Sequence, residues 1–230
     1  MKSTALFVTG TDTGVGKTVL TALLARYLRR RGINAAALKP ICSGSRNDAR
    51  VLHAALDGVL SLDAINPWHF RAPVAPSLAA RREHKRIKLA DVLAHVRGIQ
   101  KRFDVLLVEG AGGLLSPLGE NFNSRDLIAS LRAIPIVVCP NRLGAVNRVL
   151  LTLEALPGNA LARTRIILMS PPQADESTRS NAALLFEQCR GREILRLPWL
   201  GRRFKPEAGL RKLQVRKALR KLGSGLGIFP

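Results

Sequence analysis

A glycine-rich segment that ends in a lysine and a threonine is the part of this chain best suited to chemistry. It runs from Gly10 to Thr18 as Gly-Thr-Asp-Thr-Gly-Val-Gly-Lys-Thr. Glycines let backbone N–H groups turn inward around an anion, and the N-terminus of a following helix adds a partial positive charge. Lys17 can then reach the β- and γ-phosphates of a nucleotide, and the Thr18 hydroxyl can bind Mg²⁺. The segment predicts a phosphate-binding loop, although a surface turn could also contain Gly-Lys-Thr.

The spacing within this loop differs by one residue from the usual one. Phosphate loops ordinarily follow the pattern G-x-x-x-x-G-K-[ST], with four residues between the first two glycines. Here Thr11 stands where the first glycine is expected, and five residues separate Gly10 from Gly16. The loop nevertheless follows an apolar run and precedes an apolar-periodic stretch, which is the strand–loop–helix order that phosphate binding requires.

A carboxylate further along the chain could serve the same phosphates. Glu109 ends a buried apolar run at residues 104–108, and Gly110, Ala111 and Gly112 follow it. Glycines there permit the backbone to approach a ligand closely. Glu109 could hold Mg²⁺ beside Thr18, directly or through water. The alternative is a polar residue of a solvent-facing loop.

Two other charged residues each allow two interpretations. Asp48 is a second candidate magnesium ligand, or it caps a helix. Lys39 precedes Pro40, and a proline holds the residue before it extended and so fixes where its side chain points. Lys39 would then face the phosphate loop, or it is a solvated lysine at the end of a strand.

Apolar strands that alternate with amphipathic helices are expected to position these groups. We expect strands at residues 5–8, 35–38, 104–108, 134–138, 166–169 and 194–197. We expect helices at residues 18–31, 48–56, 87–100, 124–131, 144–155, 178–189 and 210–222, with Ser124 capping its helix and a loop over residues 66–76. This pattern predicts an α/β fold of the P-loop NTPase type, a mostly parallel sheet with helices on both faces. Ligands of such sheets bind beyond the carboxyl ends of the strands.

Length and composition favour a single domain over residues 1–230, with a basic tail at residues 205–230. No apolar run reaches the ~18–20 residues that cross a membrane, and the first residues lack the pattern of a secretory signal. A cytoplasmic protein without a membrane partner is therefore expected. Cys42, Cys139 and Cys189 show no C-x-x-C spacing, so neither a zinc site nor a disulfide framework is indicated.

Net charge is the one extreme feature of the composition. Thirty-seven Lys and Arg against sixteen Asp and Glu give a formal net charge of +21, which predicts salt-sensitive attraction to polyanions. Aromatic residues make up only 4% of the chain, so platforms for base stacking are scarce. The basic residues are spread over short runs, as on solvated helix faces, at residues 29–31, 81–82, 202–203, 211–212, 216–217 and 220–221. We therefore do not expect a nucleic-acid partner.

Four segments together resemble the dethiobiotin synthetase family. They are residues 8–18 with the phosphate loop, residues 39–45 with Asn47-Asp48-Ala49, residues 108–113, and Leu197-Pro198-Trp199-Leu200. The five-residue spacing of the loop is shared with that family. Order and intervals fit over roughly residues 3–200, and the tail after about residue 205 matches nothing in it.

The resemblance implies an ATP- and Mg²⁺-dependent ring closure in biotin synthesis. In that family 7,8-diaminononanoate takes up CO₂ as a carbamate, ATP phosphorylates the carbamate, and the second amine closes the ureido ring with release of phosphate. Lys17 and Lys39 would neutralise charge on the carbamate and the γ-phosphoryl group as catalytic residues. The nucleotide would lie on Gly14, Val15, Gly16, Lys17, Thr18, Val19, Glu109, Gly110, Ala111, Gly112, Ser170, Pro198, Trp199 and Leu200. Mg²⁺ would lie on Thr18, Asp48 and Glu109, and the diamine or its carbamate on Thr13, Lys39 and Ser43.

The family also acts as a homodimer in which the substrate carboxylate meets a helix N-terminus of the neighbouring subunit. The matching stretch is residues 141–147, with Gly144 and Asn147 as substrate contacts. A plain surface helix start would read the same. The sequence departs from the family in a shortened loop between Ser43-Gly44 and Asn47-Asp48. It also has Ser170 where the family often places an asparagine that reads adenine. A serine has fewer donors and acceptors than an amide, which predicts a less selective nucleotide pocket.

A partition- or septum-placing ATPase that cycles on DNA or membrane is the alternative function. The charge of +21 favours it, and the helix expected at residues 210–222 could serve as a membrane-binding amphipathic helix. Such switches carry a second lysine at the start of the phosphate loop, where this chain has Asp12. Asp12 and the Lys39-Pro40 segment favour the synthetase.

Overall fold

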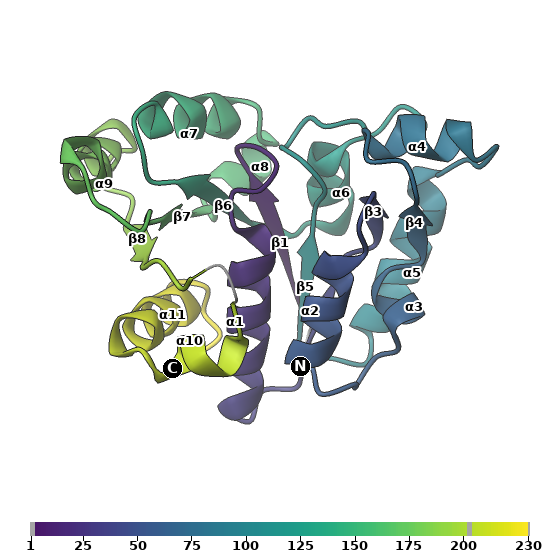
Figure 1. Ribbon diagram of the computed structural model, residues 1–230, viewed down its shortest axis with the longest axis horizontal. Coiled ribbons are helices and arrows are strands. Elements are labelled where there is room, and N and C mark those ends of the chain that lie inside the picture. Colours follow the sequence, from purple (N-terminus) through teal and green to yellow (C-terminus); the bar gives the residue numbers. More distant parts are fainter. Residues whose placement is uncertain (1–2, 202–203, 230) are drawn as a thin grey trace.

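One parallel six-stranded sheet forms the centre of the computed structural model, which describes residues 3–201 and 204–229 (Figure 1). The strand order is β2-β5-β1-β6-β7-β8. The strands are β1 (Thr4–Gly10), β2 (Ala35–Leu38), β5 (Val105–Glu109), β6 (Ile134–Pro140), β7 (Arg165–Met169) and β8 (Ile194–Leu197). The basic pair at residues 202–203 lies outside the described residues.

The register of the central strands explains where the charged groups meet. β1 and β5 are apolar runs buried on both faces, as covered parallel strands require. They pair in parallel with Val8 opposite Glu109. The carboxylate of β5 therefore lies at the same edge of the sheet as the phosphate loop, which begins two residues after Val8.

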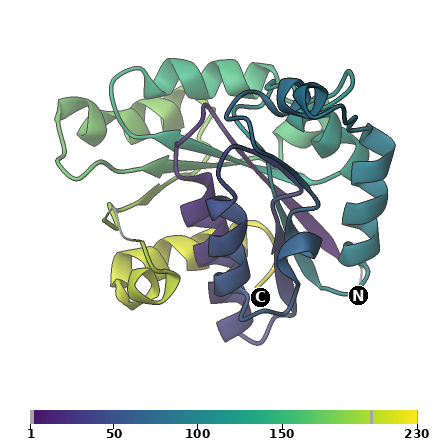
Figure 2. The ribbon, with the colours of Figure 1, turned by 45° about the vertical axis from the view of Figure 1, so that its right-hand side comes forward.

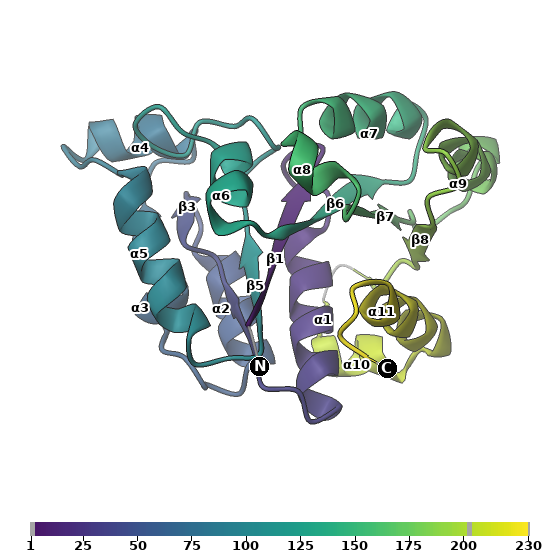
Figure 3. The same ribbon diagram turned by 180° about the vertical axis from the view of Figure 1, so that it is seen from behind.

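Helices cover both faces of this sheet. α1 (Lys17–Arg30) packs on β1, β2 and β5, with α2 (Asn47–Ala55) beside it, as the purple and blue helices in front of the sheet in Figure 2 show. α6 (Ser124–Leu131) and α8 (Gly158–Leu161) pack on β1 and β6 from the opposite side and face the viewer in Figure 3. Three further helices are α5 (Leu89–Gln100), α7 (Ala145–Glu154) and α9 (Glu176–Gln188).

The prediction of a loop at residues 66–76 is wrong in part, because one strand of a second, two-stranded sheet lies there. β4 (Trp68–Phe70) pairs in parallel with β3 (Ile41–Ser43), and α3 (Leu62–Ile65) and α4 (Pro76–Arg82) flank it. In the sequence this strand is a run of three aromatic residues between prolines, a pattern that favours a loop. Burial stabilises this strand, since Phe70 is 1% exposed.

Two helix ends also differ from expectation. Asn123, not Ser124, caps α6, in a reciprocal capping box with Asp126. The tail forms two helices rather than one, α10 (Pro206–Arg211) and α11 (Leu213–Gly225), because Lys212 between them is extended. In the described part of the chain, no helix combines the length and the apolar content needed to cross a membrane.

Candidate active site

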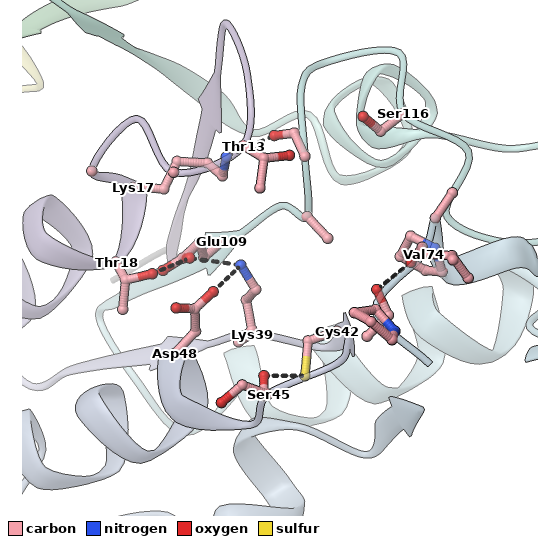
Figure 4. A pocket seen from close by; sticks show the side chains of 18 of the residues that line it. Thr13, Lys17, Thr18, Lys39, Cys42, Ser45, Asp48, Val74, Glu109 and Ser116 are labelled. Carbon is pink, nitrogen blue, oxygen red and sulfur yellow. Dashed lines mark hydrogen bonds and ion pairs between the residues drawn. The ribbon is translucent and has the colours of Figure 1, made fainter. Parts of the chain in front are cut away.

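A cavity of about 680 Å³ opens at the carboxyl ends of β1, β2 and β5. Most of the residues singled out from the sequence line it, as Figure 4 shows for several of them. They are Thr13, Gly14, Gly16, Lys17, Thr18, Val19, Lys39, Ser43, Asp48, Glu109, Ala111 and Gly112. Segments far apart in the chain therefore contribute to one site.

The glycines of the loop adopt the conformation that anion binding needs. Gly14 has φ 70° and Gly16 has φ 100°, in the left-handed region that favours glycine. Gly16 is the N-cap of α1 and makes no side-chain cap. The first N–H groups of α1 therefore remain available to an anion. The side chain of Val15, within the loop, is buried and does not line the cavity.

Lys17 is held at the cavity by one carbonyl of the phosphate loop and one of the segment after β5. Its Nζ donates to the carbonyls of Asp12 and Gly112, both at 2.7 Å. Burial, followed by the nearby Lys39 ammonium, lowers the pKa of Lys17 to about 8. The side chains of Lys17 and Lys39 both line this cavity, so the two ammonium groups share one site.

Lys39 lies between the two carboxylates. Its Nζ donates to Glu109 Oε1 at 2.7 Å and to the Gly110 carbonyl at 3.0 Å, and pairs with Asp48 Oδ2 at 3.0 Å. Burial alone would lower the pKa of Lys39, but the Glu109 and Asp48 carboxylates raise it above its ordinary value. The same pairing lowers the pKa of Asp48 against the opposing effect of burial. Lys39 is thus a buried cation, not a solvated strand-end lysine.

The donor set around Glu109 fits a divalent cation. Thr18 Oγ1 donates to Glu109 Oε1 at 2.7 Å. Asp48 pairs with the Lys39 ammonium group, as Glu109 does. Glu109 Oε2 is buried and has no hydrogen-bond partner among the described residues. A buried, unpaired carboxylate oxygen is costly without a cation or a donor. Asp48 lies in the first turn of α2, and the N-cap is Arg46, so Asp48 does not cap that helix.

The backbone at Lys39 is fixed by a fully buried asparagine that the sequence did not single out. Asn66 donates to the carbonyls of Lys39 at 2.7 Å and Pro40 at 3.3 Å, and accepts from Arg46 Nε at 3.1 Å. The Lys39 N–H in turn donates to Ile65. These bonds tie the end of β2 to α3.

Replacing Asn66 by Ala is expected to lower the free energy of unfolding by about 2–3 kcal/mol, because buried carbonyls lose their donor. Urea unfolding followed by circular dichroism measures this loss. Asn159→Ala changes an exposed residue of α8 and should cost less than about 0.5 kcal/mol. Equal losses in the two variants would contradict the role of Asn66.

A proline-rich wall closes one side of the cavity. Ser43 Oγ donates to the Val74 carbonyl at 2.5 Å, and Pro73, Val74, Ala75 and Pro76 line the cavity. Cys42, Ser45, Ser116 and Pro117 line it as well. Of these wall residues only Ser43 was predicted as a site residue, because prolines and small side chains in a loop carry no chemical signal in the sequence.

A second cavity of about 430 Å³ lies at the ends of β7 and β8. It lies near the phosphate loop, because Ser170 of its wall directly follows Met169, whose side chain packs against Gly16 of the loop. A Cβ atom on Gly16 would be 2.9 Å from Met169 Cε. Ser170 and Pro198 line it, together with Asn141, Ala174, Thr178, Arg179, Arg196 and Gln214. Trp199 and Leu200 follow Pro198 but do not line either cavity. Gly110 lies behind the site, on a small cavity at Phe7.

Gly144 and Asn147 do not reach the main cavity within one chain. Gly144 is the N-cap of α7 with φ 85°, and its neighbour Leu143 is 84% exposed. Both predicted substrate contacts lie on the outer surface near this leucine.

Comparison with known proteins agrees with this geometry. A family model described as an AAA domain matches residues 4–203. The chain is 40% identical, over 83% of its length and 87% of the relative, to the ATP-dependent dethiobiotin synthetase BioD of Anaeromyxobacter sp. (strain Fw109-5). It is 35% identical to the protein of the same name from Methanocaldococcus jannaschii, over 71% of this chain and 78% of that one.

Solved structures resemble the chain in fold. A ParA family ATPase from Chlorobium tepidum TLS superposes with a TM-score of 0.60 at 17% identity, covering 97% of this chain and 99% of that one. At this identity the likeness establishes the P-loop α/β fold alone.

Proposed function

The chain belongs to the dethiobiotin synthetase family, and from that premise we propose how its two cavities carry out the reaction of the family. That reaction is the ATP-dependent carboxylation and ring closure of 7,8-diaminononanoate with CO₂, which yields dethiobiotin, ADP and phosphate. The observation that carries the proposal is the convergence of Lys17, Lys39 and the Thr18–Asp48–Glu109 group on one cavity.

The phosphate loop binds the triphosphate of ATP in this proposal. The N–H groups of residues 14–19 face the β- and γ-phosphates at the start of α1, and Lys17 exchanges its carbonyl partners for phosphate oxygens. Ala111 and Gly112 border the same phosphates. The base lies in the second cavity, against Ser170 and Pro198, with Trp199 and Leu200 behind Pro198.

Thr18, Asp48 and Glu109 would hold Mg²⁺ together with phosphate oxygens. The unpaired Oε2 of Glu109 and the oxygen-only donor set fit this hard cation. Bound there, Mg²⁺ supplies neutralisation of charge on the β- and γ-phosphates.

Lys39 brings the carbamate and the γ-phosphoryl group together. These two anions repel each other, and a buried ammonium group held in place by its ion pairs lowers the cost of their approach. The carbamate oxygen attacks the γ-phosphorus and ADP leaves. The second amine then attacks the carbamate carbon, expelling phosphate and closing the ring. Thr13 and Ser43 border the space left for the diamine.

A homodimer would complete the substrate site. Leu115, Leu143 and Leu151 are 53%, 84% and 61% exposed, and a groove of about 360 Å³ runs between Leu115 and Leu151. Exposed leucines at such density mark an interaction surface. The start of α7, with Gly144 and Asn147, belongs to the same region and would meet the substrate carboxylate of the partner subunit.

Leu143→Asp is expected to weaken self-association at least about tenfold, because a leucine that the proposed dimer would bury is replaced by a charged residue. Sedimentation velocity over a dilution series measures the change. Leu213→Asp, at an exposed leucine on α11, is the matched control. An unchanged dimer in the Leu143 variant, or a monomeric parent protein, would remove the interface.

The whole chain, residues 1–230, is proposed to act as one domain, because α10 and α11 pack on α1 and β8. A cytoplasmic location remains a prediction from the sequence. The alternative of a partition-type ATPase draws on the fold likeness, the charge and the helix expected at residues 210–222. Asp12 argues against it, because it stands where such ATPases carry a second lysine at the start of the phosphate loop.

Mass spectrometry tests the activity directly. The protein is incubated with Mg·ATP, bicarbonate and 7,8-diaminononanoate, and dethiobiotin should form only when all are present. ATP hydrolysis that responds to duplex DNA or anionic vesicles, without dethiobiotin, would support the alternative function instead.

A further inference from the structure

The second cavity offers few side chains with free hydrogen-bonding groups. Asn141 is 2% exposed, and its amide is already engaged: Nδ2 donates to the Thr178 carbonyl at 2.9 Å and Oδ1 accepts from Asn181 at 2.9 Å. Thr178 bonds to Asp175 in the cap of α9. The polar groups left for a ligand are those of Ser170, Arg196 and Gln214, together with Arg179, whose Nη1 also pairs with Glu176 Oε2 at 3.4 Å.

Gln214 is the one uncommitted amide on this cavity. It lies in the first turn of α11 and is exposed, and its side-chain amide makes no hydrogen bond to another of the described residues. An amide presents a donor and an acceptor side by side, whereas arginine offers donors only and serine a single hydroxyl. Gln214 therefore supplies an amide group, which Ser170 at the end of β7 does not have.

The tail holds Gln214 in a fixed place. α11 buries Val215, Leu219 and Leu222 on its inner face. Lys212 Nζ donates to the Trp199 carbonyl at 3.2 Å, just beyond Pro198 of the cavity wall. On α10, Gly209 lies against α1, where a Cβ would be 2.8 Å from Leu23 Cδ2. Glu207 pairs with Arg26 and Arg30 of α1. The amide is presented by a docked helix, not by a free tail.

We propose that Gln214, supplied by a C-terminal helix beyond the residues 4–203 matched by the family model, is the residue that reads the nucleotide base. The inference rests on the proposed function, in which the triphosphate lies on the neighbouring phosphate loop. Glutamine recognises adenine through its 6-amino group and ring nitrogen. The donors of Arg196 and Arg179 complement the 6-oxo group of guanine. Gln214 sets the preference for ATP, and the arginines admit GTP.

Binding of fluorescent N-methylanthraniloyl ATP and GTP to the full-length protein tests this inference. Gln214→Ala should weaken binding of the ATP analogue roughly five- to tenfold, because its paired contact is lost, and the GTP analogue less. Gln214→Glu should raise the preference for the ATP analogue over the GTP analogue by roughly tenfold, because a carboxylate accepts from the 6-amino group and repels a 6-oxo group. A merely structural role of residue 214 would weaken both analogues alike.

Lys217→Glu is the matched control, since it changes the charge at an exposed position of the same helix by two units, against one unit in Gln214→Glu. It should leave the ratio of the two dissociation constants within about twofold. An unchanged ratio in both Gln214 variants overturns the inference, as does an equal change in the Lys217 variant. Dethiobiotin formation is measured on the same samples. Its absence in the parent protein would reject the proposed function, whereas the ratio of dissociation constants alone decides the role of Gln214.

Discussion

Replacing Lys39 by Ala is expected to lower turnover by roughly 10²–10³-fold while nucleotide still binds, because the group that brings two anions together is lost. Lys39 makes its contacts with Glu109, Asp48 and the Gly110 carbonyl, whereas the phosphate loop and Lys17 remain in place. The loss should therefore appear in kcat, with a smaller change in the affinity for Mg·ATP. Single-turnover formation of dethiobiotin and equilibrium nucleotide binding measure the two effects.

The Lys39 variant needs a check on folding, because removing one partner of a buried ion pair leaves an uncompensated charge. Circular dichroism melting in the presence of Mg·ATP supplies it. Lys88→Ala removes an exposed lysine before α5 and should retain full turnover. A folded Lys39 variant that turns over like the Lys88 variant would remove Lys39 from the mechanism.

Replacing Glu109 by Gln is expected to produce the second large effect, a loss of Mg²⁺ affinity. Glutamine keeps an oxygen to accept from Thr18 but removes the negative charge and places a donor amide near the position of Oε2. The Mg²⁺ concentration for half-maximal activity should rise at least about tenfold, since a charged carboxylate ligand is replaced by a neutral amide.

Mn²⁺ binding followed by electron paramagnetic resonance, at fixed ATP, separates this loss from an effect on catalysis. Glu154→Gln, the same substitution at the exposed end of α7, is the control. If the Glu109 variant binds Mn²⁺ as the Glu154 variant does, Glu109 is not a metal ligand.

Local signals were sufficient for most of the main sheet. Residues 35–38 and 194–197 were expected as strands with the bounds that β2 and β8 have, and the helix at residues 124–131 has the bounds of α6. Continuous apolar runs specify buried parallel strands, because both faces are covered. The pair β3 and β4 was missed because three-residue strands derive their stability from pairing between segments distant in the chain, which no local pattern reveals.

The site was predictable where one residue type has one chemical use. Lys17 and Thr18 follow from the phosphate loop, and Glu109 from its place at the end of an apolar run. Asn66 and Gln214 could not be found in this way, because a buried amide at a turn and an exposed amide on a helix become functional only through what lies opposite them. The break at Lys212, which sets the direction of α11, carries no sequence signal that we identified.

The fate of the oxygen atoms of bicarbonate tests the account most directly. In a single turnover with ¹⁸O-labelled bicarbonate in unlabelled water, an oxygen of the carbamate should pass to the γ-phosphorus and leave with it. The account predicts inorganic phosphate that carries one ¹⁸O atom for each dethiobiotin formed. Unlabelled phosphate, as produced by the attack of water on ATP, would contradict the joining of carbamate and phosphoryl group in the pocket of Lys17 and Lys39.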